Sequence, residues 1–204
     1  MIFSPPDLKS SAQWSGMRVG LLGGSFNPPH EGHLHISLIA LRALKLDCIW
    51  WLVTPQNPLK DKAENSFNKR FAMCEDLITT PKIIVSDLER QLKTNLSWQT
   101  IRAMRLHFPC TDFVWITGMD NAQTIHKWHN WKDILSNVAT AHIARPPAYN
   151  LIENCPLRLL SSQNHVFLEK AQKVSLRPHN TYWLMQKKMV SFSSTEIRKI
   201  ALKQ

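Results

Sequence analysis

Two histidines, His30 and His33, lie three residues apart in a segment rich in glycine and proline. The segment reads Gly23-Gly24-Ser25-Phe26-Asn27-Pro28-Pro29-His30-Glu31-Gly32-His33. Paired glycines permit positive φ and let main-chain N–H groups approach a phosphate closely. Histidines in the first turn of a helix lie where unpaired N–H groups and the helix dipole attract negative charge. These residue types therefore predict a site that binds phosphate groups.

Neither of two familiar phosphate-binding loops matches this segment. It lacks the G-K-[ST] ending of one and the glycine spacing of the G-x-G-x-x-G loop. His30 and His33 can also supply two ligands to zinc, but no third ligand follows at a recognisable spacing, so no metal site is predicted. The plainer alternative is a turn whose histidines cap the helix or face solvent.

A second helix start lies near the C-terminal end, in the segment Phe192-Ser193-Ser194-Thr195-Glu196-Ile197-Arg198. Ser193 precedes Glu196 by three residues, the spacing of a capping box. The hydroxyls of Ser194 and Thr195 suit a triphosphate, and Arg198 adds a charge-assisted contact. An ordinary capped helix explains the same pattern, because capping boxes are common.

Apolar runs alternate with segments of helical spacing along most of the chain. Strands are predicted over residues 18–22, 48–53, 82–85, 112–117 and 139–144. Helices are predicted over residues 34–45, 67–78 and 97–106. Strands separated by helices predict an α/β fold: a Rossmann-like, mostly parallel sheet with helices on both faces and a small helical part at the C-terminal end. Residues 148–179 are weakly patterned, and only loops with short elements are predicted there.

A length of 204 residues fits one domain. Residues 1–16 mix proline, serine, aspartate and lysine, so a flexible N-terminal extension is predicted there. No stretch approaches the ~20 apolar residues that span a bilayer, so no membrane association is predicted. The cysteines are far apart and form no C-x-x-C pair. Reduced thiols in a cytoplasmic protein are therefore expected.

The formal net charge of +10 favours anionic ligands. The lysines and arginines are scattered rather than gathered in a block, and no nucleic-acid-binding module is recognisable, so nucleic acid is not predicted as a partner. Oligomeric state is not written in any pattern of the sequence, and a homo-oligomer stays open.

The histidine segment resembles the G-x-F-[DN]-P-x-H-x-G-H motif of the adenylyltransferase and cytidylyltransferase superfamily. Residues 192–198 resemble its I-S-S-T-x-I-R motif, with Phe192 in place of isoleucine. The resemblance covers the chain from about Met17 to Arg198 and implies a single nucleotidyltransferase domain over residues 17–204. It implies in-line attack on an α-phosphate, with pyrophosphate leaving and no covalent enzyme intermediate.

The same resemblance implies roles for individual residues. His33 would hydrogen-bond the α-phosphate, with His30 and Arg198 supporting the phosphates as the other catalytic residues. Mg²⁺ would bridge the ATP phosphates, held mainly by substrate oxygens and water. The ATP-binding residues would be Gly23, Gly24, Ser25, Phe26, Gly118, Asp120, Ser194 and Thr195.

Segments between the two motifs indicate the acceptor. Thr54-Pro55-Gln56-Asn57-Pro58-Leu59-Lys60 resembles the loop after the second strand in nicotinate-nucleotide adenylyltransferases. Asn57 can donate to a carboxylate and Lys60 is a cation near a strand end. A surface turn is the alternative, because proline and asparagine are usual turn residues.

Gly118-Met119-Asp120-Asn121, followed by Trp128 and Trp131, resembles that family's G-x-D segment with its W-x-x-W. Asp120 would accept hydrogen bonds from ribose or adenine, Trp128 would stack on the pyridine ring, and Trp131 fits the core better. Glu89 also lies in a segment similar to the family's. Residues 96–101 depart from the family's Y-T-x-x-T-L pattern: Leu96 removes an aromatic contact, while Ser97 keeps a hydroxyl near the expected nicotinate carboxylate.

The resemblance thus implies an enzyme that joins ATP and nicotinate mononucleotide to form deamido-NAD and pyrophosphate. A related enzyme that prefers nicotinamide mononucleotide is the first rival, and a phosphopantetheine adenylyltransferase is the second. A nucleotide-binding regulator without turnover is a rival from another class. The presence of His30, His33 and Arg198 argues against that last reading.

Overall fold

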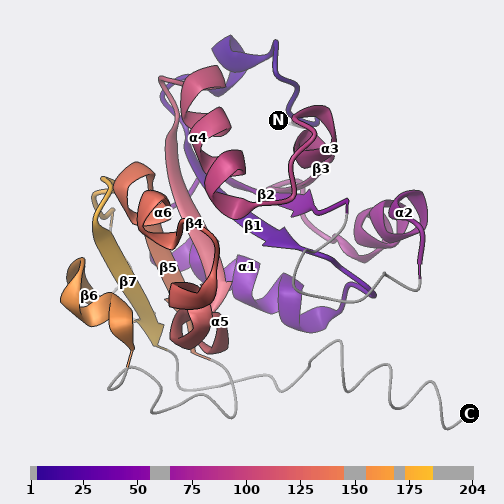
Figure 1. Cartoon of the computed structure of the whole chain (residues 1–204). Coiled ribbons are helices and arrows are strands. Elements are labelled where there is room, and N and C mark those ends of the chain that lie inside the picture. The colour runs from indigo at the N-terminus through magenta and orange to yellow at the C-terminus, as the bar shows by residue number, and fades with distance from the viewer. Residues whose placement is uncertain (1–3, 56–64, 145–154, 168–172, 186–204) are drawn as a thin grey trace, which may run out of the picture.

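The computed structural model describes residues 4–55, 65–144, 155–167 and 173–185. Within these ranges seven strands form one sheet in the order β3-β2-β1-β4-β5-β7-β6, and all neighbouring pairs are parallel (Figure 1). The prediction of a Rossmann-like parallel sheet is therefore confirmed. The strands are β1 (Arg18–Gly24), β2 (Cys48–Val53), β3 (Ile83–Ser86), β4 (Asp112–Gly118), β5 (Ala139–Ile143), β6 (Ser162–Phe167) and β7 (Asn180–Met185).

Helices cover both faces of this sheet, as the sequence predicts (Figure 1). Helices α1 and α2 pack on one face, and α3, α4 and α6 pack on the other. Because successive side chains of a strand point to opposite faces, Trp51 of β2 joins the first layer and Trp50 the second. The helices are α1 (Glu31–Ala43), α2 (Phe67–Leu77), α3 (Leu88–Gln91), α4 (Ser97–His107), α5 (Met119–Thr124) and α6 (Trp131–Asn137), with short 3₁₀ turns η1 (Ser11–Trp14), η2 (Ile125–Lys127) and η3 (Pro156–Leu159).

The strand order reverses direction between β1 and β4. The chain runs outward from β1 through β2 to β3 and then returns to the other side of β1. Open parallel sheets bind ligands beyond the carboxyl ends of the strands at such a switch point. Gly24 ends β1 and Gly118 ends β4, so both glycines lie at that edge of the sheet.

The sequence locates the regular elements well where the apolar pattern is strong. The predicted strand over residues 48–53 coincides with β2, and the helices predicted from residues 34, 67 and 97 correspond to α1, α2 and α4. Strands β6 and β7 were not predicted. β6 is an edge strand whose residues are mostly polar and at least partly exposed, so it carries no apolar run. The helix predicted from Ser193 lies outside the described residues.

Residues 10–16 pack against the sheet, which differs from the flexible extension predicted there. Trp14 is fully buried, and its ring meets that of Trp50 edge-on at a centroid distance of 4.8 Å. Thr111 Oγ1 donates to the Trp14 carbonyl at 2.8 Å, and the Gly16 N–H donates to the Cys110 carbonyl at 2.7 Å. The large apolar area of one indole therefore holds residues 10–16 on the fold.

Candidate active site

His30 and His33 form a reciprocal cap at the start of α1. His30 is the N-cap residue, and its Nδ1 accepts from the Gly32 main-chain N–H at 3.1 Å. His33, at the third helical position, accepts at Nδ1 from the His30 N–H at 3.2 Å. This is the arrangement of a capping box, with imidazole nitrogens in place of hydroxyl and carboxylate oxygens. The capping alternative considered from the sequence is therefore real, and it also orients both rings.

The cap determines which imidazole nitrogen can donate. A neutral imidazole carries one proton, so a ring that accepts at Nδ1 carries the proton on Nε2. The centroids of the two rings lie 3.9 Å apart. Both rings therefore lie together at the N-terminal end of α1, where the helix dipole already favours an anion.

The aromatic rings of Phe26 and Trp51 pack beside His33. The Phe26 ring lies 4.8 Å from the His33 ring and stacks on Trp51 at 5.1 Å. Trp51 Nε1 donates to Ser37 Oγ at 2.9 Å, and that hydroxyl donates to the His33 carbonyl at 2.8 Å. Through these contacts the buried β2 strand fixes the first turn of α1.

Position 23 is a glycine because a Cβ would have no room there, not because the backbone has a positive φ. The residue of this loop with a positive φ is Phe26, at 46°. Phe26 is only 1% exposed, so packing holds this costly conformation. A Cβ on Gly23 would lie 2.7 Å from Trp115 Cη2, and one on Gly24 would lie 3.2 Å from Phe26 Cε2. Neither glycine uses the positive φ that glycine permits.

Arg70 of α2 is a buried cation beneath the loop that joins β1 to α1. Its Nη1 donates to the Ser25 carbonyl at 2.6 Å and to the Thr54 carbonyl at 2.8 Å. Nη2 donates to the Pro55 carbonyl at 2.9 Å, and Nε donates to the Asn65 carbonyl at 3.2 Å. Burial lowers the pKa of this guanidinium, which is only 1% exposed. The sequence analysis missed this residue.

Asn27 makes a second tie between the same two regions. Its Oδ1 accepts from Asn65 Nδ2 at 2.9 Å and from the Asn65 main-chain N–H at 3.3 Å. Asn27 itself is buried. The loop after β1 is therefore joined to the segment before α2 by both Arg70 and Asn27.

The end of β4 contributes Gly118 and Asp120. Gly118 is buried and caps α5, while Asp120 is exposed in the first turn of that helix. Beneath them, Thr117 Oγ1 lies 2.7 Å from Nδ1 of His142, a fully buried residue of β5. Burial lowers the pKa of His142 to about 3, so its ring is neutral at physiological pH. The sequence analysis did not single out His142, which sits within an ordinary apolar strand pattern.

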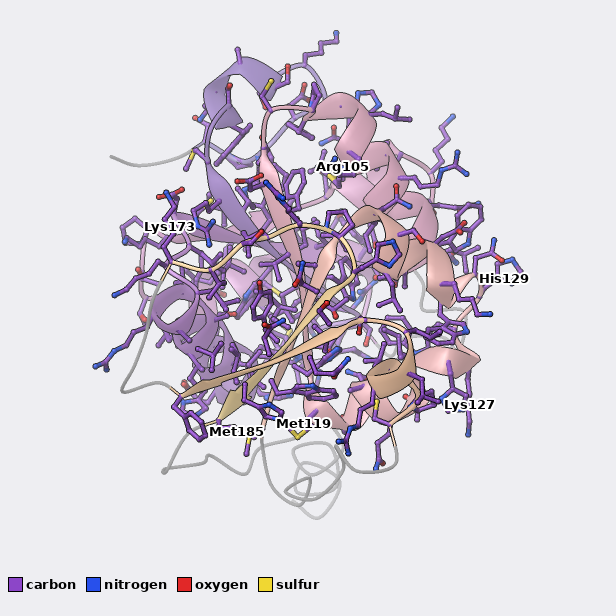
Figure 2. All side chains as sticks on the ribbon, turned by 90° about the vertical axis from the view of Figure 1, so that its left-hand side faces the viewer. Arg105, Met119, Lys127, His129, Lys173 and Met185 are labelled. Atoms are coloured by element: carbon purple, nitrogen blue, oxygen red, sulfur yellow. The ribbon has the colours of Figure 1, made fainter. Side chains whose placement is uncertain are left out.

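Helix α5 and the last residue of β7 lie at the carboxyl end of the sheet, where β4 also ends. Figure 2 shows Met119, which follows β4, and Met185, which ends β7, at one end of the molecule, and both belong to one apolar cluster. Lys127 and His129 are exposed, on a different side of the molecule from Met185 (Figure 2).

Ser97 and Trp128 come from neighbouring elements. Ser97 is the first residue of α4, and the ring of the adjacent Trp98 lies 6.2 Å from that of His129, next to Trp128. Trp128 and Trp131 are both half-buried and both pack against core residues. The sequence predicts that Trp131 belongs to the core and that Trp128 offers a face to a ligand. The structure shows no such difference between the two side chains.

Glu89 is a buried carboxyl between β2 and α4. Its Oε2 accepts from Thr54 Oγ1 at 2.7 Å, and its Oε1 accepts from Thr100 Oγ1 at 3.0 Å. Burial raises the pKa of Glu89 to about 7, and these two hydrogen bonds oppose part of that rise. Thr54 follows β2, whereas Thr100 lies one turn along α4 from Ser97. Glu89 thus joins the end of β2 to the helix that carries Ser97.

Five of the predicted site residues lie outside the described ranges: Asn57, Lys60, Ser194, Thr195 and Arg198. Among the residues that are described, no three histidine, cysteine, aspartate or glutamate side chains gather as metal ligands do. Within the same ranges, every helix is too short or too polar to cross a lipid bilayer.

Comparison with known proteins agrees with this geometry. Residues 21–200 match the model of the cytidylyltransferase-like family. A Ruegeria protein described as a probable nicotinate-nucleotide adenylyltransferase is 38% identical over 183 residues, which cover 90% of this chain and 97% of that protein. A Parvibaculum lavamentivorans protein with the same description is 49% identical over 132 residues, or 64% of this chain and 66% of that protein.

A solved structure shares the fold. The nicotinic acid mononucleotide adenylyltransferase of Plasmodium falciparum, complexed with NaAD, aligns with a TM-score of 0.67 at 19% identity. The alignment covers 90% of this chain and 83% of that one. On the family match and the similarity over nearly the whole length of its relatives, the chain belongs to the cytidylyltransferase-like family and, within it, to the nicotinate-nucleotide adenylyltransferases.

Proposed function

We propose that this chain transfers AMP from ATP to nicotinate mononucleotide, in the pathway that makes NAD. A phosphate oxygen of nicotinate mononucleotide attacks the α-phosphorus of ATP, and a new P–O bond forms. The bond from the α-phosphorus to the bridging oxygen of the β-phosphate breaks, so deamido-NAD and pyrophosphate are the products. The reciprocal histidine cap at the switch point of the sheet carries this proposal, because it fixes two imidazole rings at a helix N-terminus, where an anion is expected.

His33 and His30 act in this proposal as hydrogen-bond donors rather than as nucleophiles or bases. Their Nδ1 atoms accept from main-chain N–H groups, so a neutral ring carries its proton on Nε2, the atom proposed to donate to the phosphates. Arg198 is proposed as the third catalytic group. Catalysis would rest on alignment of the substrates and on neutralisation of charge, without a covalent intermediate.

ATP is proposed to bind along the edge formed by the ends of β1 and β4. Its phosphates would meet the loop after β1, and its adenosine would lie near the end of β4. ATP would enter as its Mg²⁺ complex, with phosphate oxygens and water as the main metal ligands. The proposed ATP-binding residues are Gly23, Gly24, Ser25, Phe26, Gly118, Asp120, Ser194 and Thr195.

Nicotinate mononucleotide is proposed to bind on the side of α4, with Ser97 and Trp128 joined by Asn57 and Lys60. The position of Ser97 at the N-terminus of α4 supports a carboxylate there, because main-chain N–H groups are available in the first turn. A cytoplasmic location is proposed as well, where thiols are kept reduced; three of the four cysteines are buried, and none is placed in a disulfide.

Direct competition between acceptors tests the substrate. The purified protein would be incubated with ATP and equal concentrations of nicotinate mononucleotide and nicotinamide mononucleotide, and both dinucleotide products would be measured. We expect deamido-NAD to form in large excess, since a site that donates to a carboxylate leaves donors unpaired with an amide. A preference for the amide would reject nicotinate as the acceptor. Absence of pyrophosphate release with either acceptor would reject the reaction itself.

A further inference from the structure

The geometry assigns to Arg70 the role of a positioning residue that holds the ATP side and the acceptor side of the site in register. This inference rests on the proposed function. Arg70 is on α2, and none of the roles proposed above includes it. One planar guanidinium ties the Ser25 carbonyl, in the loop after β1, to the Thr54 carbonyl, at the end of β2.

The contacts of Arg70 continue to the acceptor side through described residues. Thr54, whose carbonyl accepts from Arg70, donates its hydroxyl to Glu89. The other oxygen of Glu89 accepts from Thr100, on the helix that begins at Ser97. Ser25, Arg70, Thr54, Glu89 and Thr100 therefore form one continuous chain of hydrogen bonds from the proposed phosphate loop to the proposed acceptor helix.

The nature of the acceptors supports positioning rather than ion pairing. All four hydrogen bonds of this guanidinium within the described residues end on main-chain carbonyl oxygens. Arginine presents five N–H donors in a fixed plane, whereas the three donors of a lysine ammonium rotate, so arginine is better suited to hold carbonyls of separate segments in fixed positions. Arg70 therefore sets main-chain positions on two sides of the site at once.

Positioning of this kind affects the rate because in-line transfer requires the two substrates to be aligned. A displacement of about 1 Å can lower a rate by roughly 100-fold. The variant R70K keeps the charge but serves fewer of the carbonyls. We expect its kcat, at saturating concentrations of both substrates, to fall on the order of 100-fold, with changes of only a few-fold in each KM.

Arg90 provides a matched control. Its guanidinium lies over the same Phe67 ring as that of Arg70, at 5.3 Å against 5.6 Å, but Arg90 is exposed and donates to the Asn68 side chain. The variant R90K should keep the wild-type kcat and KM values. Thermal unfolding followed by circular dichroism would show that each variant is fully folded at the assay temperature.

The outcome for the folded variants decides the inference. If R70K is folded and keeps a kcat within about threefold of the wild type, Arg70 only stabilises the fold and the inference is wrong. If R70K does not fold, the variant T54V decides, because it removes the hydroxyl through which the contacts of Arg70 reach Glu89. A fall in its kcat of roughly threefold or more, at an unchanged Tm, would support positioning, and no fall would overturn it. Inactive wild-type protein would instead reject the proposed function.

Discussion

His33 Nδ1 accepts a hydrogen bond from the main-chain N–H of His30, 3.2 Å away, and His30 caps the same helix turn in return. The pair fixes the orientation of two imidazole rings at the N-terminal end of α1. Replacement of His33 by alanine removes its proposed donor and should therefore lower kcat by about 10²–10³-fold, the usual cost of losing one donor to a transition-state anion.

A histidine two residues further along α1 provides the control for that measurement. His35 is half-buried on the same helix and is outside the proposed site, so His35→Ala should leave kcat within a few-fold of the wild type. Steady-state pyrophosphate release at saturating ATP and nicotinate mononucleotide measures both variants. Equal rates for His33→Ala and the wild type would remove His33 from the catalytic groups.

Glu89 should make the protein less stable as the pH rises through neutrality. Its pKa rises from 4.5 to about 7 on burial, so between these values the folded state holds a proton that the unfolded state has lost. Stability therefore falls as pH increases across this window, by a total on the order of 3 kcal/mol from this group. The variant Glu89→Gln should lose that part of the pH dependence.

Urea unfolding at pH 5 and pH 7.5 tests this expectation, with the exposed Glu75→Gln on α2 as control. The wild type and Glu75→Gln should lose stability between the two pH values by similar amounts, and Glu89→Gln should lose clearly less. The same loss in all three proteins would show that Glu89 does not titrate in this range.

Gly23 should resist substitution because of Trp115. An added Cβ would lie 2.7 Å from Trp115 Cη2, so Gly23→Ala overpacks the end of β1. We expect Gly23→Ala to lower the free energy of unfolding by about 1–3 kcal/mol and to reduce activity, because the end of β1 leads directly into the phosphate loop.

A double variant separates this steric effect from a loss of backbone freedom. Phenylalanine lacks the Cη2 atom, so in the background Trp115→Phe the added methyl group has room. The cost of Gly23→Ala in that background, measured by chemical unfolding, should be clearly smaller than in the wild type. An equal cost in both backgrounds would show that the contact with Trp115 is not the reason for glycine at this position.

Trp14 should stabilise the whole fold although it lies before the first strand. The ring is fully buried against Trp50, so Trp14→Ala should lower the free energy of unfolding by about 3–5 kcal/mol. Leu106→Ala is a control at a side chain that is 78% exposed, and it should change stability by about 0.5 kcal/mol or less. A similar small change for Trp14→Ala would restore the view of residues 1–16 as an extension without structural importance.

The sequence predicts the parallel sheet and the histidine cap because both are local patterns. The apolar run of β2 and the glycine, proline and histidine spacing before α1 each lie within about ten residues. The sequence does contain a local signal that Arg70 is buried. Arg70 shares a helix face with Phe67, Phe71 and Cys74, and a charged residue on such an apolar face requires buried partners.

Other features depend on contacts that no local pattern contains. The identity of the Arg70 acceptors, in the loops after β1 and β2, requires the folded arrangement of both strands. The burial of Trp14 depends on Trp50 and Thr111, which are distant in the chain. Strand β6 pairs at the edge of the sheet through its main chain, and its polar side chains give no periodic signal.

The fate of the α-phosphate tests the central claim most directly. The protein would be incubated with ATP labelled in the α-phosphate and with nicotinate mononucleotide, and the products would be separated by chromatography. The proposed reaction predicts that the label moves into deamido-NAD, that unlabelled pyrophosphate forms in equal amount, and that no label stays on the protein. Label that remains in ATP with nicotinate mononucleotide and with its amide, or label bound covalently to the protein, would contradict the account.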